Sequence, residues 1–172
     1  MFAKLKQSIL EKKFDASLLK FVQNRKTSQK EILSVGILTS EEISSKNDIQ
    51  KEVETLLNVR NTKIISFRKF NKLDEVSFKH FSENDINWKG EFTQENLQSF
   101  LEQPFDLLIG YFNTNNLYLE TAVLKSNATF KVGFSKVNSK LYELEISEDV
   151  SNLHQFLSEL KKYLIILKKL KI

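Results

Sequence analysis

The sequence predicts an α/β fold, a Rossmann-like three-layer sandwich with a mostly parallel sheet of about five to six strands and a long C-terminal helix. Four nearly continuously apolar segments indicate strands buried on both faces: 34–39, 63–68, 105–112 and 129–135. Segments with apolar residues at helical spacing alternate with them. At 172 residues, the chain can bury roughly 70% of its unfolded surface in one core. We therefore expect a single domain, 1–172, in which a basic helical N-terminal segment (1–30) precedes the sheet core (31–172).

The N-terminal segment is predicted to be helical but interrupted. One apolar stripe, Phe2 to Ile9, is rotated about the helix axis from a second stripe, Leu10 to Phe21. This drift predicts two short helices, or one helix bent near 14–17. After the first strand, apolar residues at helical spacing over 49–57 predict a helix, and Ser45 with Asp48 resembles a capping box at its start. With the second strand, these elements form a βαβ unit whose crossover should be right-handed.

The middle of the chain contains one ambiguous segment. Residues 69–84 fit a short helix, a strand or an ordered loop. Residues 86–92 predict a short strand. Thr93 is a candidate N-cap for the helix that follows, and Pro104 ends that helix. Beyond the third apolar strand, the run 117–126 predicts a buried helix.

The last third predicts two strands and a helix. Residues 140–146 alternate apolar and polar, as expected of a half-exposed strand. A hairpin closed by 136–140 would make this strand an antiparallel edge. Residues 150–172 predict the longest helix, with an apolar stripe facing the sheet and lysines on the other side. Ile165 falls among those lysines, where it is either incidental or a contact for a partner.

The composition excludes several classes of protein. With no cysteine, the chain forms no disulfide, thiolate metal site, iron–sulfur cluster or cysteine nucleophile. The N-terminus is too charged for a signal peptide. The longest apolar runs fall far short of the ~20 residues that span a bilayer. We therefore expect a cytoplasmic protein without a membrane partner.

Positive charge gathers at the N-terminus. Residues 1–30 hold eight basic and two acidic residues, a net charge of +6, whereas the remainder has a net charge of −2. Such asymmetry predicts an anionic partner, although a run of charge can also serve only to solvate a helix face. The candidate surface for that partner comprises Lys4, Lys6, Lys12, Lys13, Arg25, Lys26, Lys161, Lys162, Lys168 and Lys169.

The common motifs of nucleotide and hydrolase sites are missing. The phosphate-binding patterns G-x-x-x-x-G-K-[ST] and G-x-G-x-x-G are absent, as is the G-x-S-x-G elbow. His80 and His154 lack metal-ligand spacing, and we interpret both as structural or solvated. We therefore expect no cofactor, no metal and no catalytic residue, and we favour a protein that is not an enzyme.

A polar corner follows the strand at 105–112, and it has two interpretations. In open α/β sheets, ligands bind at the carboxyl ends of the strands. The candidate crevice residues at those ends are Thr39, Ser40, Arg68, Asn113, Thr114 and Asn115. Their hydroxyl, amide and guanidinium groups suit a nucleotide or a sugar phosphate. Asn113 and Thr114 are also ordinary N-cap residues for the next helix, and capping alone would explain them.

Two resemblances accompany these patterns. INWKGEF, FDLLIGYF and FKVGF, with the terminal LKKYLIILKKL, resemble a small α/β family of unknown function from Bacteroidota, over roughly residues 30–172. That resemblance implies a cytoplasmic single-domain protein and carries no activity. A buried strand with an early aspartate, a helix and ATFKVGF are similar in outline to the acceptor-side half of heptosyltransferase-like glycosyltransferases. The chain lacks the second Rossmann half that holds the sugar nucleotide there, so this likeness concerns architecture.

These observations favour a binding module over a small-molecule enzyme or sensor. The first hypothesis is a non-enzymatic binding module for an RNA-containing, ribosome-associated assembly or for a protein partner, which docks on the basic N-terminal helices. The alternative is a small-molecule enzyme or sensor whose site lies at the strand carboxyl ends.

Overall fold

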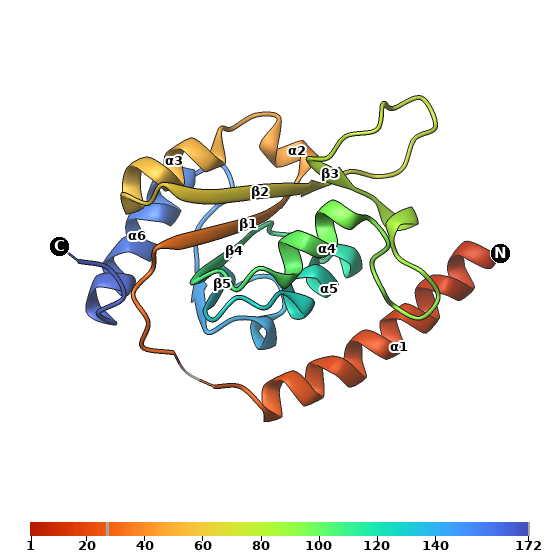
Figure 1. Ribbon diagram of the computed structural model, residues 1–172, viewed down its shortest axis with the longest axis horizontal. Coiled ribbons are helices and arrows are strands. Elements are labelled where there is room, and N and C mark those ends of the chain that lie inside the picture. The colour runs from red at the N-terminus through yellow and green to blue at the C-terminus, as the bar shows by residue number, and fades with distance from the viewer. Residues whose placement is uncertain (27, 172) are drawn as a thin grey trace.

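A computed structural model describes residues 1–26 and 28–171 (Figure 1). Six parallel strands form one sheet in the order β3-β2-β1-β4-β5-β6. The strands are β1 (Ser34–Ser40), β2 (Asn61–Phe67), β3 (His80–Phe81), β4 (Leu107–Tyr111), β5 (Lys131–Phe134) and β6 (Leu144–Ile146). The chain builds outward from β1 to β3, crosses to the other side of β1, and builds outward again from β4 to β6. The Rossmann-like fold predicted from the apolar segments is therefore confirmed.

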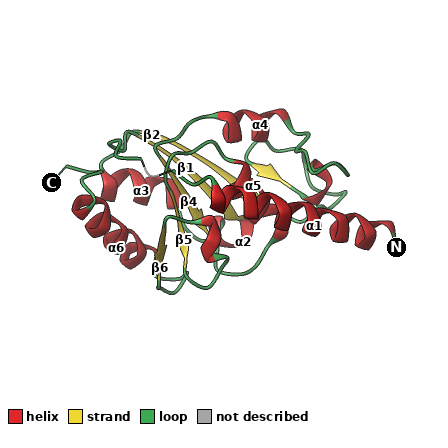
Figure 2. Ribbon diagram, turned by 90° about the horizontal axis from the view of Figure 1, so that it is seen from below, coloured by secondary structure: helices red, strands yellow, loops and turns green. Residues whose placement is uncertain are grey.

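Helices cover both faces of the sheet. They are α1 (Phe2–Gln23), α2 (Glu41–Ser44), α3 (Ile49–Leu57), α4 (Glu95–Glu102), α5 (Leu117–Lys125) and α6 (Leu153–Ile166), with 3₁₀ turns η1 (Glu83–Asp85) and η2 (Ser139–Leu141). Helices α3 and α6 pack together on one face, whereas α1, α4 and α5 lie on the other (Figures 1 and 2). Helix α1 contacts α5 and η2 from the outside of this layer, and its N-terminal end extends past the sheet.

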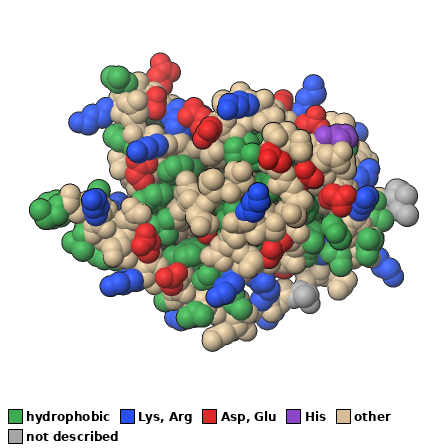
Figure 3. Space-filling view, turned by 180° about the vertical axis from the view of Figure 1, so that it is seen from behind, with side chains coloured by type: hydrophobic (Ala, Val, Ile, Leu, Met, Phe, Trp, Pro, Cys, Tyr) green, Lys and Arg blue, Asp and Glu red, His purple; other side chains and the backbone are tan. Residues whose placement is uncertain are grey.

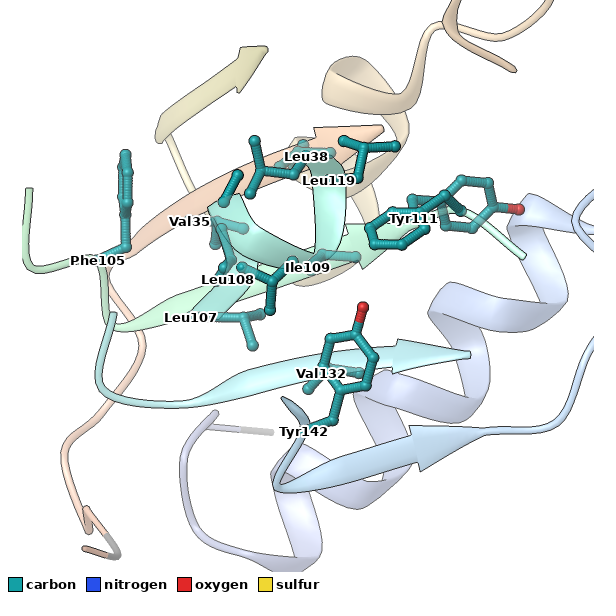
Figure 4. Close-up of a cluster of buried hydrophobic side chains, with 14 of the residues drawn as sticks. Val35, Leu38, Phe105, Leu107, Leu108, Ile109, Tyr111, Leu119, Val132 and Tyr142 are labelled. Atoms are coloured by element: carbon teal, nitrogen blue, oxygen red, sulfur yellow. The ribbon is translucent and has the colours of Figure 1, made fainter. Parts of the chain in front are cut away.

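The four apolar segments form the centre of the sheet, as predicted. Strands β4 and β5 are buried at every position, and β1 at all but its two ends. Figure 4 shows their side chains packed in one cluster, with Leu119 of α5 beside Leu38 of β1. Strand β2 is fully buried only near its carboxyl end. Burial on both faces is therefore confirmed for β1, β4 and β5, whereas β2 is only partly buried.

The edges of the sheet differ from the prediction. The ambiguous segment supplies the edge strand β3, while Ile86 and Phe92 form a single antiparallel bridge around a turn at Gly90, whose φ is 81°. At the other edge, β6 pairs parallel to β5, so the predicted hairpin is wrong. The residues of the predicted hairpin instead form a crossover through η2. Val137 and Leu141 hold this crossover against the core because both are buried.

The terminal helices differ as well. Helix α1 is continuous over 22 residues, so the predicted break is not found. The predicted long C-terminal helix is present as α6, but with 14 residues it is shorter than α1. Helix α6 ends at Ile166 because Lys168 adopts a positive φ of 59°. Ile165 is half-buried, and its neighbour Ile166 is exposed. Thr93 does not cap α4, since its hydroxyl donates to the Asp85 carbonyl instead.

Candidate functional site

Two of the predicted crevice residues are engaged within the fold. Thr39 is fully buried, and its hydroxyl donates to the Tyr111 carbonyl at 2.6 Å, which joins β1 to β4. Ser40 is the N-cap of α2 and accepts a hydrogen bond from the Ile43 N–H at 3.4 Å. Both hydroxyls therefore serve local structure.

The polar corner after β4 does begin α5, but with a different cap. The side-chain oxygen of Asn116 accepts from two backbone N–H groups of the first turn, both at 3.0 Å. Residues 113–115 precede this cap, and their side chains form no hydrogen bond within the part of the chain that the structure describes. The N-cap role predicted for Asn113 and Thr114 is therefore wrong, because the helix begins at Leu117 and Asn116 occupies the cap position. Thr114 and Asn115 are exposed.

Arg68 belongs to a polar cluster on the other side of β1. Its guanidinium lies 3.5 Å from the Asp74 carboxylate and 4.0 Å from that of Glu41, and Nη2 donates to the Glu75 carbonyl at 2.9 Å. Strands β2 and β4 flank β1 on opposite sides. Arg68 and Asn113 therefore follow strands that lie on opposite sides of β1 and are not neighbours.

His80 completes this cluster. Its Nδ1 lies 2.8 Å from the Ser77 hydroxyl, and its Nε2 lies 3.8 Å from the Glu41 carboxylate. Burial and then the nearby Arg68 charge lower the pKa of His80 below its ordinary value, although the Glu41 and Asp74 carboxylates act in the opposite direction. The cluster pairs its charges internally and connects the loop between β2 and β3 to the start of α2.

A cavity lies elsewhere, in a groove between α1 and α5. Its volume is about 800 Å³, within the range of ligand-binding pockets. The apolar lining comprises Leu10, Phe14, Ala16, Phe21, Ile86, Leu124 and Ala128. Helix α1 meets the core through Leu10, Phe14 and Leu18, which are the buried residues of that helix. The adjacent strip of α1 is therefore left to line the groove.

The rim of the groove is strongly basic. Six cations line it: Lys13, Lys20, Arg25, Lys26, Lys89 and Lys125. Among the described lining residues, Glu143 is the one acid. Such a cavity suits an occupant that is apolar on one side and negatively charged on the other.

One of these cations is held in place by the protein. Arg25 donates to the Tyr142 carbonyl at 3.2 Å and to the Lys140 carbonyl, and its Nε lies 3.9 Å from Glu143. Its guanidinium also lies 4.9 Å from the ring centroid of Phe21. Arg25 therefore fixes the chain that leaves α1 against the crossover between β5 and β6.

A further cation lies beneath the groove. Lys131 of β5 is only 2% exposed, and its Nζ lies 4.7 Å from the centroid of the Phe21 ring. Burial lowers the pKa of Lys131 to about 8; Glu143 raises the value and Arg25 lowers it further. Phe21 thus separates a buried amine from the groove.

The predicted cationic surface is divided between two faces. The lysines of α1 lie on one side of the sheet, and the lysines within and after α6 lie on the other side. Exposed members are Lys4, Lys12, Lys13, Lys26, Lys161, Lys162 and Lys168, and Lys6 is half-buried. Lys169 is buried, since its Nζ donates to the Ser28 carbonyl and lies 4.5 Å from the Phe130 centroid. Lys169 is therefore a fold residue.

The face seen from behind Figure 1 carries both positive and negative side chains. Figure 3 shows lysine, arginine and acidic side chains interspersed there. On α6, Lys162 pairs with Glu159 at 3.0 Å. The groove is therefore the better candidate for an anionic partner. Sequence reasoning selected Lys13, Arg25 and Lys26 of its rim but missed Lys20, Lys89 and Lys125.

The comparisons with known proteins give the chain a family but no activity. None of the helices described is both long and apolar enough to cross a membrane. Within the same residues, no group of three or more His, Cys, Asp or Glu side chains is placed to hold a metal ion. The searches found no match among curated proteins and none among solved structures. A family model matches residues 6–167, nearly the whole chain, including α1, the sheet and α6. The chain therefore belongs to DUF6913, a family of unknown function.

Proposed function

We propose that the protein is a non-enzymatic binding module whose groove between α1 and α5 takes an acidic, amphipathic segment of a partner protein. The observation that carries this proposal is the lining of the groove. The cavity has a volume of about 800 Å³, with apolar side chains on its floor and six cations at its rim. An amphipathic helix or strand would bury its apolar side on that floor. Its carboxylates would meet the lysines at the rim.

The chemistry of the floor favours a protein over RNA. Single-stranded nucleic acid binds by stacking its bases on available aromatic rings. In the groove, Phe14 is buried in the core, and the ring of Phe21 already lies against Arg25 and Lys131. Aliphatic residues such as Leu10 and Leu124 make up much of the remaining floor. They suit apolar side chains better than bases.

The experiment is site-specific photo-crosslinking in the host cell. A benzoylphenylalanine at Ala16, which is exposed and lines the groove, should crosslink to a protein through a segment rich in Asp or Glu. The crosslink should survive nuclease and should disappear when Lys13, Lys20 and Lys125 are changed together to Gln. The same crosslinker at Lys51, on α3, is the control because it lies on the other face. Crosslinks to RNA, or equal capture from both positions, would contradict the proposal.

The strand order supports a second candidate, the small-ligand site at the strand carboxyl ends. The direction of building reverses between β1 and β4, and such switch points are where open α/β sheets bind ligands. Asn113 lies two residues beyond the end of β4 at this point. Calorimetry with ATP and with UDP-glucose tests the site. Micromolar binding that Asn113→Ala abolishes would support it, and no heat of binding for either would exclude these ligands.

A further inference from the structure

The ammonium of Lys131 is poorly satisfied for a buried charge. Its Nζ has three hydrogens to donate, and it makes one hydrogen bond, to the Leu124 carbonyl at 3.3 Å. Among residues 1–26 and 28–171 it forms no ion pair. A buried charge without a counter-ion is costly to a fold. The arrangement therefore calls for a function or a missing partner.

The nearest acid is already engaged. One carboxylate oxygen of Glu143 accepts the backbone N–H of Lys131 at 2.6 Å, and the other faces Arg25 at 3.9 Å. Glu143 thus serves the backbone and the guanidinium rather than the Lys131 side chain. Two cations and one acid leave this end of the groove with an excess of positive charge.

We propose that Lys131 selects a carboxylate on the ligand of the groove. When the acidic segment docks, one of its Asp or Glu side chains displaces the Phe21 ring and pairs with Nζ. Phe21 is suited to such a movement because it is half-buried and lines the groove. Phe14, about two turns away on α1, is buried in the core. This inference rests on the proposed function, and it names the residue that makes that function selective.

A purely structural role for Lys131 makes a different prediction. Its hydrogen bond reaches the last turn of α5, where a cation is favourable against the helix dipole. If Lys131 is kept for that contact, Lys131→Met should destabilise the protein. If it is kept for a ligand, methionine should fill the same space without the cost of burying a charge. Stability should then be unchanged or higher, and binding should weaken.

Binding should also depend on pH. A carboxylate pairs with the ammonium and not with the neutral amine, so affinity is full below the pKa of about 8 and falls above it. Other charges near Lys131 are Glu143, Arg25 and the rim residues Lys20 and Lys125. Affinity at pH 9 should therefore be about tenfold lower than at pH 7.

The test uses a defined probe, a fluorescein-labelled amphipathic helix of Leu and Glu, with a Leu and Gln peptide of the same pattern as its control. Anisotropy titrations from pH 6.5 to 9.5 compare wild type with Lys131→Met and Lys131→Arg, and Lys51→Met is the matched control. Wild type should bind the Glu peptide better than the Gln peptide and lose about tenfold in affinity by pH 9. Lys131→Met should bind at least tenfold more weakly at pH 7, and both Lys131 variants should lack the loss at high pH.

Each remaining outcome decides between the two proposals. If wild type binds neither peptide, the groove proposal fails. If wild type prefers the Glu peptide and Lys131→Met binds it equally, with the same pH profile, the groove stands and the role of Lys131 is refuted. If urea unfolding shows Lys131→Met to be clearly less stable than wild type, the structural role is correct.

Discussion

The ring of Tyr142 lies directly against Gly133. A Cβ atom at position 133 would come within 2.2 Å of Tyr142 Cζ, which is far inside contact distance. Gly110 pairs with Gly133 in the sheet, and a Cβ there would lie 2.4 Å from the Tyr142 hydroxyl oxygen. Two facing glycines on β4 and β5 therefore create the space that this ring fills, and the ring holds the crossover to β6 against the sheet.

Gly133→Ala should destabilise the protein. The added methyl has no free space, and overpacking of this kind costs roughly 1–3 kcal/mol. Urea unfolding followed by circular dichroism measures the change in the free energy of unfolding. Ser135→Ala is the control because Ser135 is exposed just beyond the same strand. Combining Gly133→Ala with Tyr142→Ala should cost less than the sum of the two single changes. If Gly133→Ala has the same free energy of unfolding as wild type, the contact is refuted.

The same contact explains which parts of the fold were predictable. The strands β1, β4 and β5 were identified because burial on both faces requires continuous apolar residues. The direction of β6 was not, because residues 140–146 alternate as a hairpin strand does. The chain crosses over before β6 and pairs with β5 in parallel. The contact that holds this crossover, Tyr142 against two glycines distant in sequence, cannot be seen in the local pattern. The end of α6 at Ile166, where Lys168 adopts a positive φ, likewise was not predicted from the sequence.

The candidate site was predictable only in part. Lys13, Arg25 and Lys26 were selected because charge is concentrated in the first thirty residues of the sequence. Lys89 and Lys125 sit in stretches without unusual charge, and they reach the groove only because α1 folds back across α5. Lys131 reads as an ordinary strand residue between Phe130 and Val132. Its burial under Phe21, a residue more than a hundred positions earlier, has no signal in the sequence.

Asn116→Ala should destabilise α5. Its side-chain oxygen accepts two backbone N–H groups that would otherwise lack partners, and losing an N-cap costs about 0.5–2 kcal/mol. Asn113→Ala and Thr114→Ala are the matched controls, and each should lie within about 0.5 kcal/mol of wild type. Thermal and urea unfolding provide the comparison. A larger loss from either control than from Asn116→Ala would show that the helix begins earlier.

Asp106→Asn should remove a stabilising contribution that depends on pH. Oδ2 accepts from the backbone N–H groups of Leu33 and Ser34 at 3.0 and 3.1 Å, and Oδ1 pairs with Lys30 at 3.0 Å. Burial favours a higher pKa for Asp106, but these hydrogen bonds and the Lys30 charge outweigh it and hold the pKa below 3.8. At pH 7 the substitution should cost about 1–3 kcal/mol.

The sign of this pH dependence follows from the lowered pKa. The carboxylate stabilises the folded state fully above its unfolded pKa of 3.8, and the contribution is lost as the pH falls through the lower folded value. The difference between wild type and Asp106→Asn should therefore be constant from pH 5 to 7 and shrink below about pH 4. A difference that stays constant down to pH 2 would show that Asp106 acts only through packing.

Two sets of lysine substitutions separate the groove from the rest of the basic N-terminus. The groove set changes Lys13, Lys20 and Lys125 to Gln, and the outer set changes Lys4, Lys6 and Lys12 to Gln, so that each removes three charges. Most of these side chains are exposed, and each single change should alter stability by no more than about 0.5 kcal/mol. The groove set should weaken binding of the Leu and Glu peptide at least tenfold, whereas the outer set should change it less than twofold.

Filter binding of total RNA across a salt series completes the comparison, because each phosphate contact releases counter-ions and makes affinity fall steeply with salt. Two results together would contradict the protein partner: the outer set abolishes a salt-dependent binding of RNA by wild type, and both sets bind the peptide equally. The partner would then be RNA, and its site would lie on the outer face of α1 rather than in the groove.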